Sequence, residues 1–94
     1  MSTKTEKYNQ EIVALFKEPG GDLIQRLALL SARISRDMVH LENRTVELQR
    51  ILARSNMSPD RLVLLSDGLL KNSQELTELH RIQQQIAKML TTAL

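Results

Sequence analysis

The chain has 94 residues, enough for one small domain, and its single Tyr, single Phe and lack of Trp leave Leu, Ile, Val and Met to build the core. It has no Cys, which excludes disulfides and thiolate metal sites. Its 13 basic and 11 acidic residues are interleaved, so a net charge of +2 gives little support to nucleic-acid binding.

The N-terminal part is predicted to contain one short helix. Residues 1–7 are polar, and we expect them to be frayed. From Tyr8 to Lys17, apolar residues recur at helical spacing, which predicts a short amphipathic helix. Pro19 disfavours helix in the residue before it, and Gly20 and Gly21 supply a flexible corner. Residues 1–21 are therefore predicted to form a polar N-terminus, a short helix and a hinge.

A long amphipathic helix is predicted from Asp22, a favoured N-cap residue, to about Ser55. Its apolar stripe advances by three and four residues, as in helices that pack side by side. The stripe consists of Leu23, Leu27, Leu30, Ile34, Met38, Leu41, Thr45, Leu48 and Leu52. One extra step of four near Met38 shifts the stripe slightly around the helix.

The segment Asn-Met-Ser-Pro, residues 56–59, predicts a tight turn into another helix. Ser58 is a favoured N-cap, and Pro59 suits the first helical position. Met57 and Leu62 occupy the two positions of a hydrophobic staple. Because a connection of only about three residues places two helices antiparallel and adjacent, these signals predict a helical hairpin.

The last helix is predicted from Pro59 toward Leu94, which completes an all-α fold. Residues 22–94 then form a hairpin of two long antiparallel helices, preceded by the short hinged helix. The stripe of the last helix consists of Leu62, Leu65, Leu69, Asn72, Leu76, Leu79, Ile82 or Gln83, Ile86 and Leu90. Gly68 costs about 1 kcal/mol relative to Ala in a helix interior, so it indicates a bend or the close approach of another backbone.

The hairpin carries more apolar surface than its two facing stripes can bury. Residues 62–65 are four consecutive apolar residues, and Leu29, Val39, Val46 and Ile51 lie off the stripe of the middle helix. The first helix could cover this surface and close a three-helix domain, but we expect burial against other chains. The predicted assembly interface is Leu62, Leu65, Leu69, Leu76, Leu79, Ile82, Ile86, Met89, Leu90 and Leu94, with its C-terminal part as the chief surface.

Candidate catalytic or metal-binding residues lack the required spacing. His40 and His80 have no second His four residues away, and Glu75 and Glu78 do not form a Glu-x-x-His motif. We therefore expect no enzyme activity, no metal or cofactor and no small-molecule substrate. No run of about 18 apolar residues occurs, so we also expect no direct membrane span.

The order of these parts resembles the inner-rod and needle subunits of bacterial type III secretion systems, more closely the inner-rod subunits. Two segments carry the resemblance: ALFKEPGGDLIQRLALLSARIS, and SNMSPDRLVLLSDGLLKNSQELTELHRIQQQIAKMLTTAL, with its turn and final amphipathic helix. The similarity covers about residues 12–94.

The resemblance implies a structural subunit that polymerises through its C-terminal hairpin into a protein-export conduit. Its partners would be copies of itself and other proteins of the secretion apparatus. It would be made in the bacterial cytoplasm and exported without a cleavable signal. A small cytoplasmic export chaperone, or a coiled-coil adaptor that binds a partner helix, remains the alternative.

Overall fold

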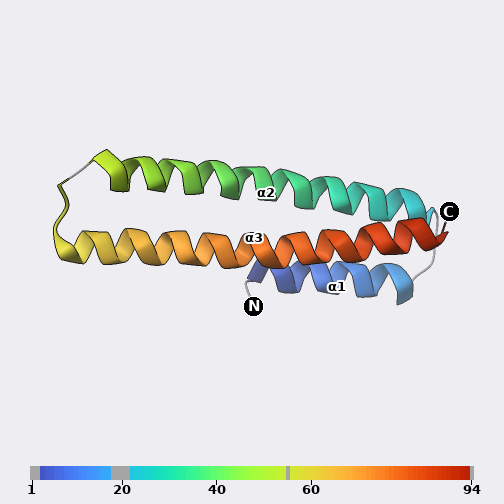
Figure 1. Ribbon diagram of the computed structural model, residues 1–94. Coiled ribbons are helices and arrows are strands. Elements are labelled where there is room, and N and C mark those ends of the chain that lie inside the picture. Colours follow the sequence, from blue (N-terminus) through green and yellow to red (C-terminus); the bar gives the residue numbers. More distant parts are fainter. Residues whose placement is uncertain (1–2, 18–21, 55, 94) are drawn as a thin grey trace.

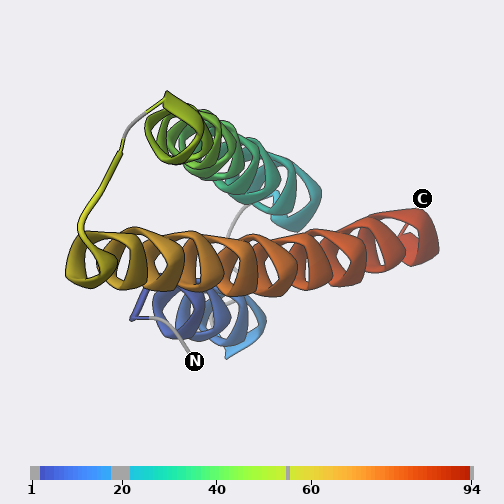
Figure 2. The ribbon, with the colours of Figure 1, turned by 60° about the vertical axis from the view of Figure 1, so that its left-hand side comes forward.

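The computed structural model describes residues 3–17, 22–54 and 56–93, which form three helices and no strand. Helix α1 spans Thr3–Lys17, α2 spans Leu23–Arg54 and α3 spans Pro59–Ala93. The two long helices pack antiparallel as a hairpin, and α1 lies against the half of α3 that includes its C-terminal end (Figures 1 and 2). The predicted all-α hairpin is confirmed, whereas the predicted Pro19-Gly20-Gly21 hinge lies outside the described residues.

Both predicted helix starts are capped as expected. The Asp22 carboxylate accepts a hydrogen bond from the backbone N–H of Gln25 at 3.2 Å, and its carbonyl accepts one from Arg26 at 3.0 Å. The Ser58 hydroxyl accepts a bond from the N–H of Arg61 at 3.4 Å. These bonds satisfy amides that have no partner inside their own helix, so they fix where α2 and α3 begin.

Helix α1 begins five residues earlier than Tyr8, so the prediction that residues 3–7 are frayed is wrong. Polar contacts to the other helices hold this turn. The Thr5 hydroxyl, on a residue only 3% exposed, donates to the Glu78 carboxylate of α3 at 2.7 Å. The Lys4 ammonium lies 3.7 Å from the Asp37 carboxylate of α2. These partners lie far away in the sequence, so no local apolar spacing reveals them.

The core lies where all three helices meet. Its buried apolar residues are Tyr8, Ile12, Leu27, Leu30, Ile34, Leu41, Leu79, Ile82 and Ile86. Every residue of the stripe predicted for α2 is buried or partly buried, which confirms that stripe. In contrast, none of the described residues between 42 and 78 is buried.

The molecule is a rod of 55 × 19 × 16 Å with a radius of gyration of 17.0 Å. A globular chain of this length would have a radius of about 12 Å. The difference arises because the hairpin is much longer than α1. The structure therefore has a three-helix end, which holds both α1 and the core, and a two-helix end at the 55–58 connection (Figure 1).

Helix α3 continues through Gly68 without interruption. A Cβ atom added at Gly68 would lie 3.8 Å from Leu48 Cδ1, which is an ordinary van der Waals contact with a side chain. Neither a helix break nor a close backbone contact therefore accounts for this glycine.

Candidate functional site

The predicted assembly interface divides between the core and the surface. Leu79, Ile82 and Ile86 are 0%, 4% and 0% exposed and belong to the intramolecular core. Leu62 is 40% exposed, and Leu94 lies outside the described residues. The others, Leu65, Leu69, Leu76, Met89 and Leu90, are partly buried. The C-terminal stripe that was expected to be the chief assembly surface is thus largely covered within the chain, by α1 and the N-terminal half of α2.

Exposed apolar side chains occur along the whole molecule, among them Val13, Phe16, Ile24, Leu29 and Val39, and a further group lies toward the two-helix end. We call Val46, Ile51, Leu62, Val63, Leu64 and Leu70 the tip surface. Val63, Leu64 and Leu70 are 68%, 72% and 57% exposed. Consecutive helical residues point in directions about 100° apart, so one neighbouring helix cannot cover all of residues 62–65. The leftover apolar surface predicted from the sequence is therefore present, and the described residues leave it uncovered.

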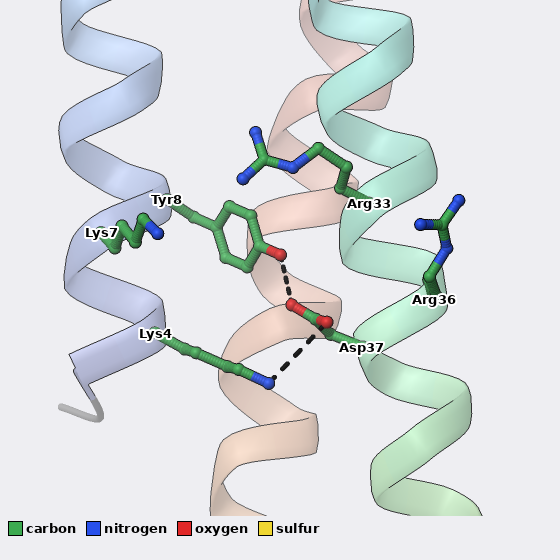
Figure 3. A pocket seen from close by; sticks show the side chains of 6 residues that line it. All are labelled: Lys4, Lys7, Tyr8, Arg33, Arg36 and Asp37. Atoms are coloured by element: carbon green, nitrogen blue, oxygen red, sulfur yellow. Dashed lines mark hydrogen bonds and ion pairs between the residues drawn. The ribbon is translucent and has the colours of Figure 1, made fainter.

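A second candidate site is the groove between α1 and α2, with α3 behind it (Figure 3). Tyr8 reaches from α1 across the groove, and its hydroxyl donates to the Asp37 carboxylate on α2. The Arg33 guanidinium lies 5.7 Å from the centre of the Tyr8 ring, within the range of a cation–π contact. Arg33 also pairs with the Glu11 carboxylate at 3.2 Å. These contacts tie α1 to α2 across the groove.

The Tyr8 hydroxyl holds its proton more tightly than a tyrosine in water does. Burial of the side chain, and then the hydrogen bond to Asp37, raise the pKa of Tyr8 from 10.0 to about 12. Both effects disfavour the phenolate, because burial removes water from the charge and the carboxylate repels it. The hydroxyl therefore remains a donor to Asp37 at neutral pH.

Helical spacing placed Tyr8, Ile12, Leu15 and Phe16 on one apolar face of the first helix. Tyr8 and Ile12 are buried and Leu15 is partly buried, whereas Phe16 is 51% exposed, and the spacing did not reveal the polar contacts of Tyr8. The partners Arg33 and Asp37 stand on the charged side of α2, where nothing in the spacing distinguishes them from solvated residues. The only usable signal is the type of residue, because Tyr has one apolar and one polar end and usually finds a partner when it is buried.

The residues considered for metal binding do not come together. His40 and His80 are both exposed, and Nε2 of His80 lies 3.4 Å from the Gln84 side-chain nitrogen on the same helix. Within residues 3–17, 22–54 and 56–93, no three His, Asp or Glu side chains are grouped so that they could hold a metal ion. Over the same residues, no helix is both long and apolar enough to cross a membrane.

Comparisons of the chain with models of known protein families, with curated proteins and with solved structures gave no match.

Proposed function

We propose that the chain is a non-catalytic helical subunit that packs its tip surface against other protein chains. The observation that supports this proposal most is the exposure of Leu64 and its apolar neighbours where only two helices pack together. Full burial of one such side chain is worth about 1.5 to 3 kcal/mol. A partner that covered several of them would gain enough free energy to form a specific complex.

The finer proposal is a structural subunit of a bacterial type III secretion apparatus, either inner-rod or needle-like. Its support is the resemblance of residues 12–94 to those subunits, together with a 55 Å hairpin whose apolar surface extends over both helices. Copies of such a rod can pack side by side and line a protein-export conduit. The chain would be made in the bacterial cytoplasm and exported without a cleavable signal.

One observation favours the alternative, a small export chaperone or coiled-coil adaptor that acts in the cytoplasm. Leu79, Ile82 and Ile86 are buried within the chain, so the C-terminal stripe needs no polymer to cover it. A subunit of this kind folds alone and then binds the helix of a partner. It forms a complex of fixed size rather than an open-ended polymer.

Light scattering after size-exclusion chromatography, over a series of concentrations, tests the proposal and separates its two forms. Open-ended growth in mass supports the assembly subunit, whereas a fixed small oligomer supports the chaperone or adaptor. Leu64→Asp should reduce association because it places a charge in the interface. Gln85→Asp, at an exposed position of the same helix, is the matched control and should associate like the wild type.

Two results would contradict the proposal. A chain that remains monomeric at every concentration would rule out the assembly subunit, because such a subunit must bind copies of itself. Association of Leu64→Asp that equals the wild type would show that the tip surface is not the interface.

A further inference from the structure

We infer that a second copy of this chain covers part of the tip surface, with α2 of one copy packed antiparallel on α3 of the next. Such pairing rests on the proposed function, since it specifies the partner of the same surface. It uses the side of the hairpin that faces away from α1, and it covers Val46, Val63 and Leu70 of the tip surface.

Each long helix carries a second row of side chains beside the stripe that faces its neighbour. Every member of this row directly follows a residue of the facing stripe, so it lies about 100° further round the helix. The members recur every seven residues, which keeps them on one side of each helix. We call these rows the outer stripes; they are Val39, Val46 and Ala53 on α2, and Val63, Leu70 and Thr77 on α3. All six residues are exposed.

The outer stripes lie on the side of the hairpin opposite to α1. On α2, α1 pairs with Arg33, which directly precedes Ile34 of the facing stripe. On α3, α1 bonds to Glu78, which directly precedes Leu79. The outer stripes follow the facing stripes instead of preceding them. In an antiparallel pair this places both outer stripes on the same side, away from α1, so a second copy can pack there without displacing α1.

The two outer stripes match in register. Leu48 packs beside Gly68. The Gln83 side chain bonds to the Ser31 carbonyl. Residues at one level of the hairpin therefore have numbers that add up to about 115. In that register the level pairs are Val46 with Leu70, Ala53 with Val63, and Val39 with Thr77. Copies placed side by side, without a shift along the rod, thus bring α2 of one against α3 of the next in the register that the two helices already use within the chain.

The polar residues beside the outer stripes are complementary as well. Asn43 and Arg50 each lie four residues after a member of the stripe on α2, and Asp67 and Gln74 do so on α3. Contact of α2 with α3 brings Arg50 near Asp67, whereas contact of either stripe with its own copy gives these two charges no opposite charge in the rows. Asp67 pairs with Lys71 of its own helix at 3.0 Å, but both side chains are more than half exposed, so this pair contributes little and leaves Asp67 accessible.

The presence of two matched stripes favours a second copy over an unrelated helix. A single foreign helix would cover one outer stripe and leave the other in water. A second copy offers its α3 to the α2 of the first, and its own α2 is then covered by a third copy. Such a contact between two different surfaces repeats from copy to copy and forms either a closed ring or an open polymer.

Disulfide trapping tests the contact directly, because the chain has no Cys of its own. Val46→Cys and Leu70→Cys are prepared as separate proteins, mixed at a concentration at which the wild type associates, and oxidised. The mixture should give at least about three times the yield of covalent dimer that either variant gives alone, because the two cysteines meet only where α2 packs on α3. The control mixture is Val46→Cys with Val63→Cys. Its cysteines are about 10 Å out of level along the helices, beyond the reach of a disulfide.

A charge exchange tests the same contact by light scattering. Arg50→Asp and Asp67→Arg should each weaken association by at least about threefold, because each places like charges opposite one another. The double variant restores an opposite pair across the contact and should associate within about twofold of the wild type. The matched control is Arg44→Asp, also at an exposed position of α2. Arg44 directly precedes Thr45 of the facing stripe, so it lies on the α1 side and its substitution should change association by less than about twofold. Circular dichroism checks that each variant is folded.

The inference and the proposed function can fail separately. A wild type that stays monomeric at every concentration would overturn the inference, while the proposed function would still stand for a chain that binds a different protein. Association with equal cross-linking in the two mixtures, or a double variant that associates no better than Arg50→Asp, would overturn the inference alone. Leu64 directly precedes Leu65 and so faces the α1 side, which makes Leu64→Asp a test of the proposed function rather than of this contact.

Discussion

The two ends of the hairpin use the same kind of helix and reach different degrees of burial. At the three-helix end, α2 and α3 share their apolar stripes with α1, and Ile34, Leu79 and Ile86 are all 0% exposed. At the two-helix end, the stripes of α2 and α3 continue, yet Leu65 and Leu69 remain only partly buried. A stripe that faces one neighbour loses only part of its contact with water. The third helix, rather than the quality of the stripe, therefore decides where the core forms.

The polar contacts follow the same division. Thr5 bonds to Glu78, Tyr8 bonds to Asp37, and the Gln83 side chain donates to the Ser31 carbonyl at 3.1 Å. All of these connect different helices at the three-helix end. At the two-helix end, Lys71 pairs with Asp67 of its own helix at 3.0 Å. The side-chain nitrogen of Asn72 is buried and has no hydrogen-bond partner among the described residues.

Ile86→Asp should have the largest effect on stability, because Ile86 lies in the better-packed end. The substitution removes a fully buried side chain, worth about 2 to 5 kcal/mol, and buries a carboxylate without a partner. We expect most of the helical circular-dichroism signal and the cooperative thermal transition to disappear. The matched variant Leu70→Asp, at a residue 57% exposed, should change the stability of the monomer by less than about 1 kcal/mol.

A folded Ile86→Asp monomer that melts like the wild type would contradict the burial of Ile86 within the chain. Ile86 would then face another chain, as the sequence alone suggested.

Ile12→Ala tests whether α1 is what distinguishes the two ends. Ile12 is 7% exposed in the shared core, so its truncation should cost about 2 to 5 kcal/mol in urea unfolding. Val13→Ala, one residue along the same helix and 50% exposed, should cost no more than about 0.5 kcal/mol. Equal effects of the two substitutions would mean that α1 does not stabilise the hairpin.

High pH should weaken the three-helix end through Tyr8. The folded-state pKa of about 12 lies above the ordinary value of 10.0, so the chain favours the protonated phenol. The stabilisation, on the order of 2 kcal/mol, is complete below about pH 10 and is lost as the pH rises toward 12. In thermal melts, the melting temperature of the wild type should fall between these pH values, and that of Tyr8→Phe should not show this fall.

Because the chain has one Tyr and no Trp, the ultraviolet absorbance of tyrosinate reports on Tyr8 directly. Ionisation near pH 10 in the folded protein would show that Tyr8 is not held against Asp37.

Gly68→Ala should have the smallest effect and should strengthen the weaker end. A methyl group would meet Leu48 at an ordinary contact distance, so it adds helix propensity without a clash. We expect a gain of about 1 kcal/mol in the free energy of unfolding. The control is Gln85→Ala, also on α3. It does not replace a glycine, so it should shift the unfolding midpoint much less. A loss of stability in Gly68→Ala would indicate that α2 and α3 lie closer together at this point than the structure shows.

The sequence predicted the parts of the fold that depend on local chemistry. Asp22 and Ser58 mark helix starts through their own side chains, and the stripes of α2 and α3 follow from helical spacing. Spacing tells which face of a helix is apolar, but it does not tell what covers that face along its length. The prediction therefore placed Leu79 and Ile86 in an interface between chains, whereas α1 and α2 cover them within the chain.

The candidate groove could not be predicted for a related reason. It depends on α1 lying beside α2, and that placement depends on pairs such as Tyr8–Asp37 and Lys4–Asp37, which join residues far apart in the sequence. Each of these residues is ordinary on a helix surface when it is considered alone. Only their meeting in space reveals the groove.

The position of the core also has a consequence for how the chain folds. The buried residues of α2 and α3 are separated by about 50 residues of sequence. The connection between the two helices lies at the end with no buried residue, so early contacts near it gain little free energy. The chain must close a long loop before its most favourable contacts can form. It therefore loses conformational entropy before those contacts can compensate for the loss. Folding should therefore be more cooperative, and slower, than is usual for a small helical protein, with a transition state that already joins α1 to both long helices.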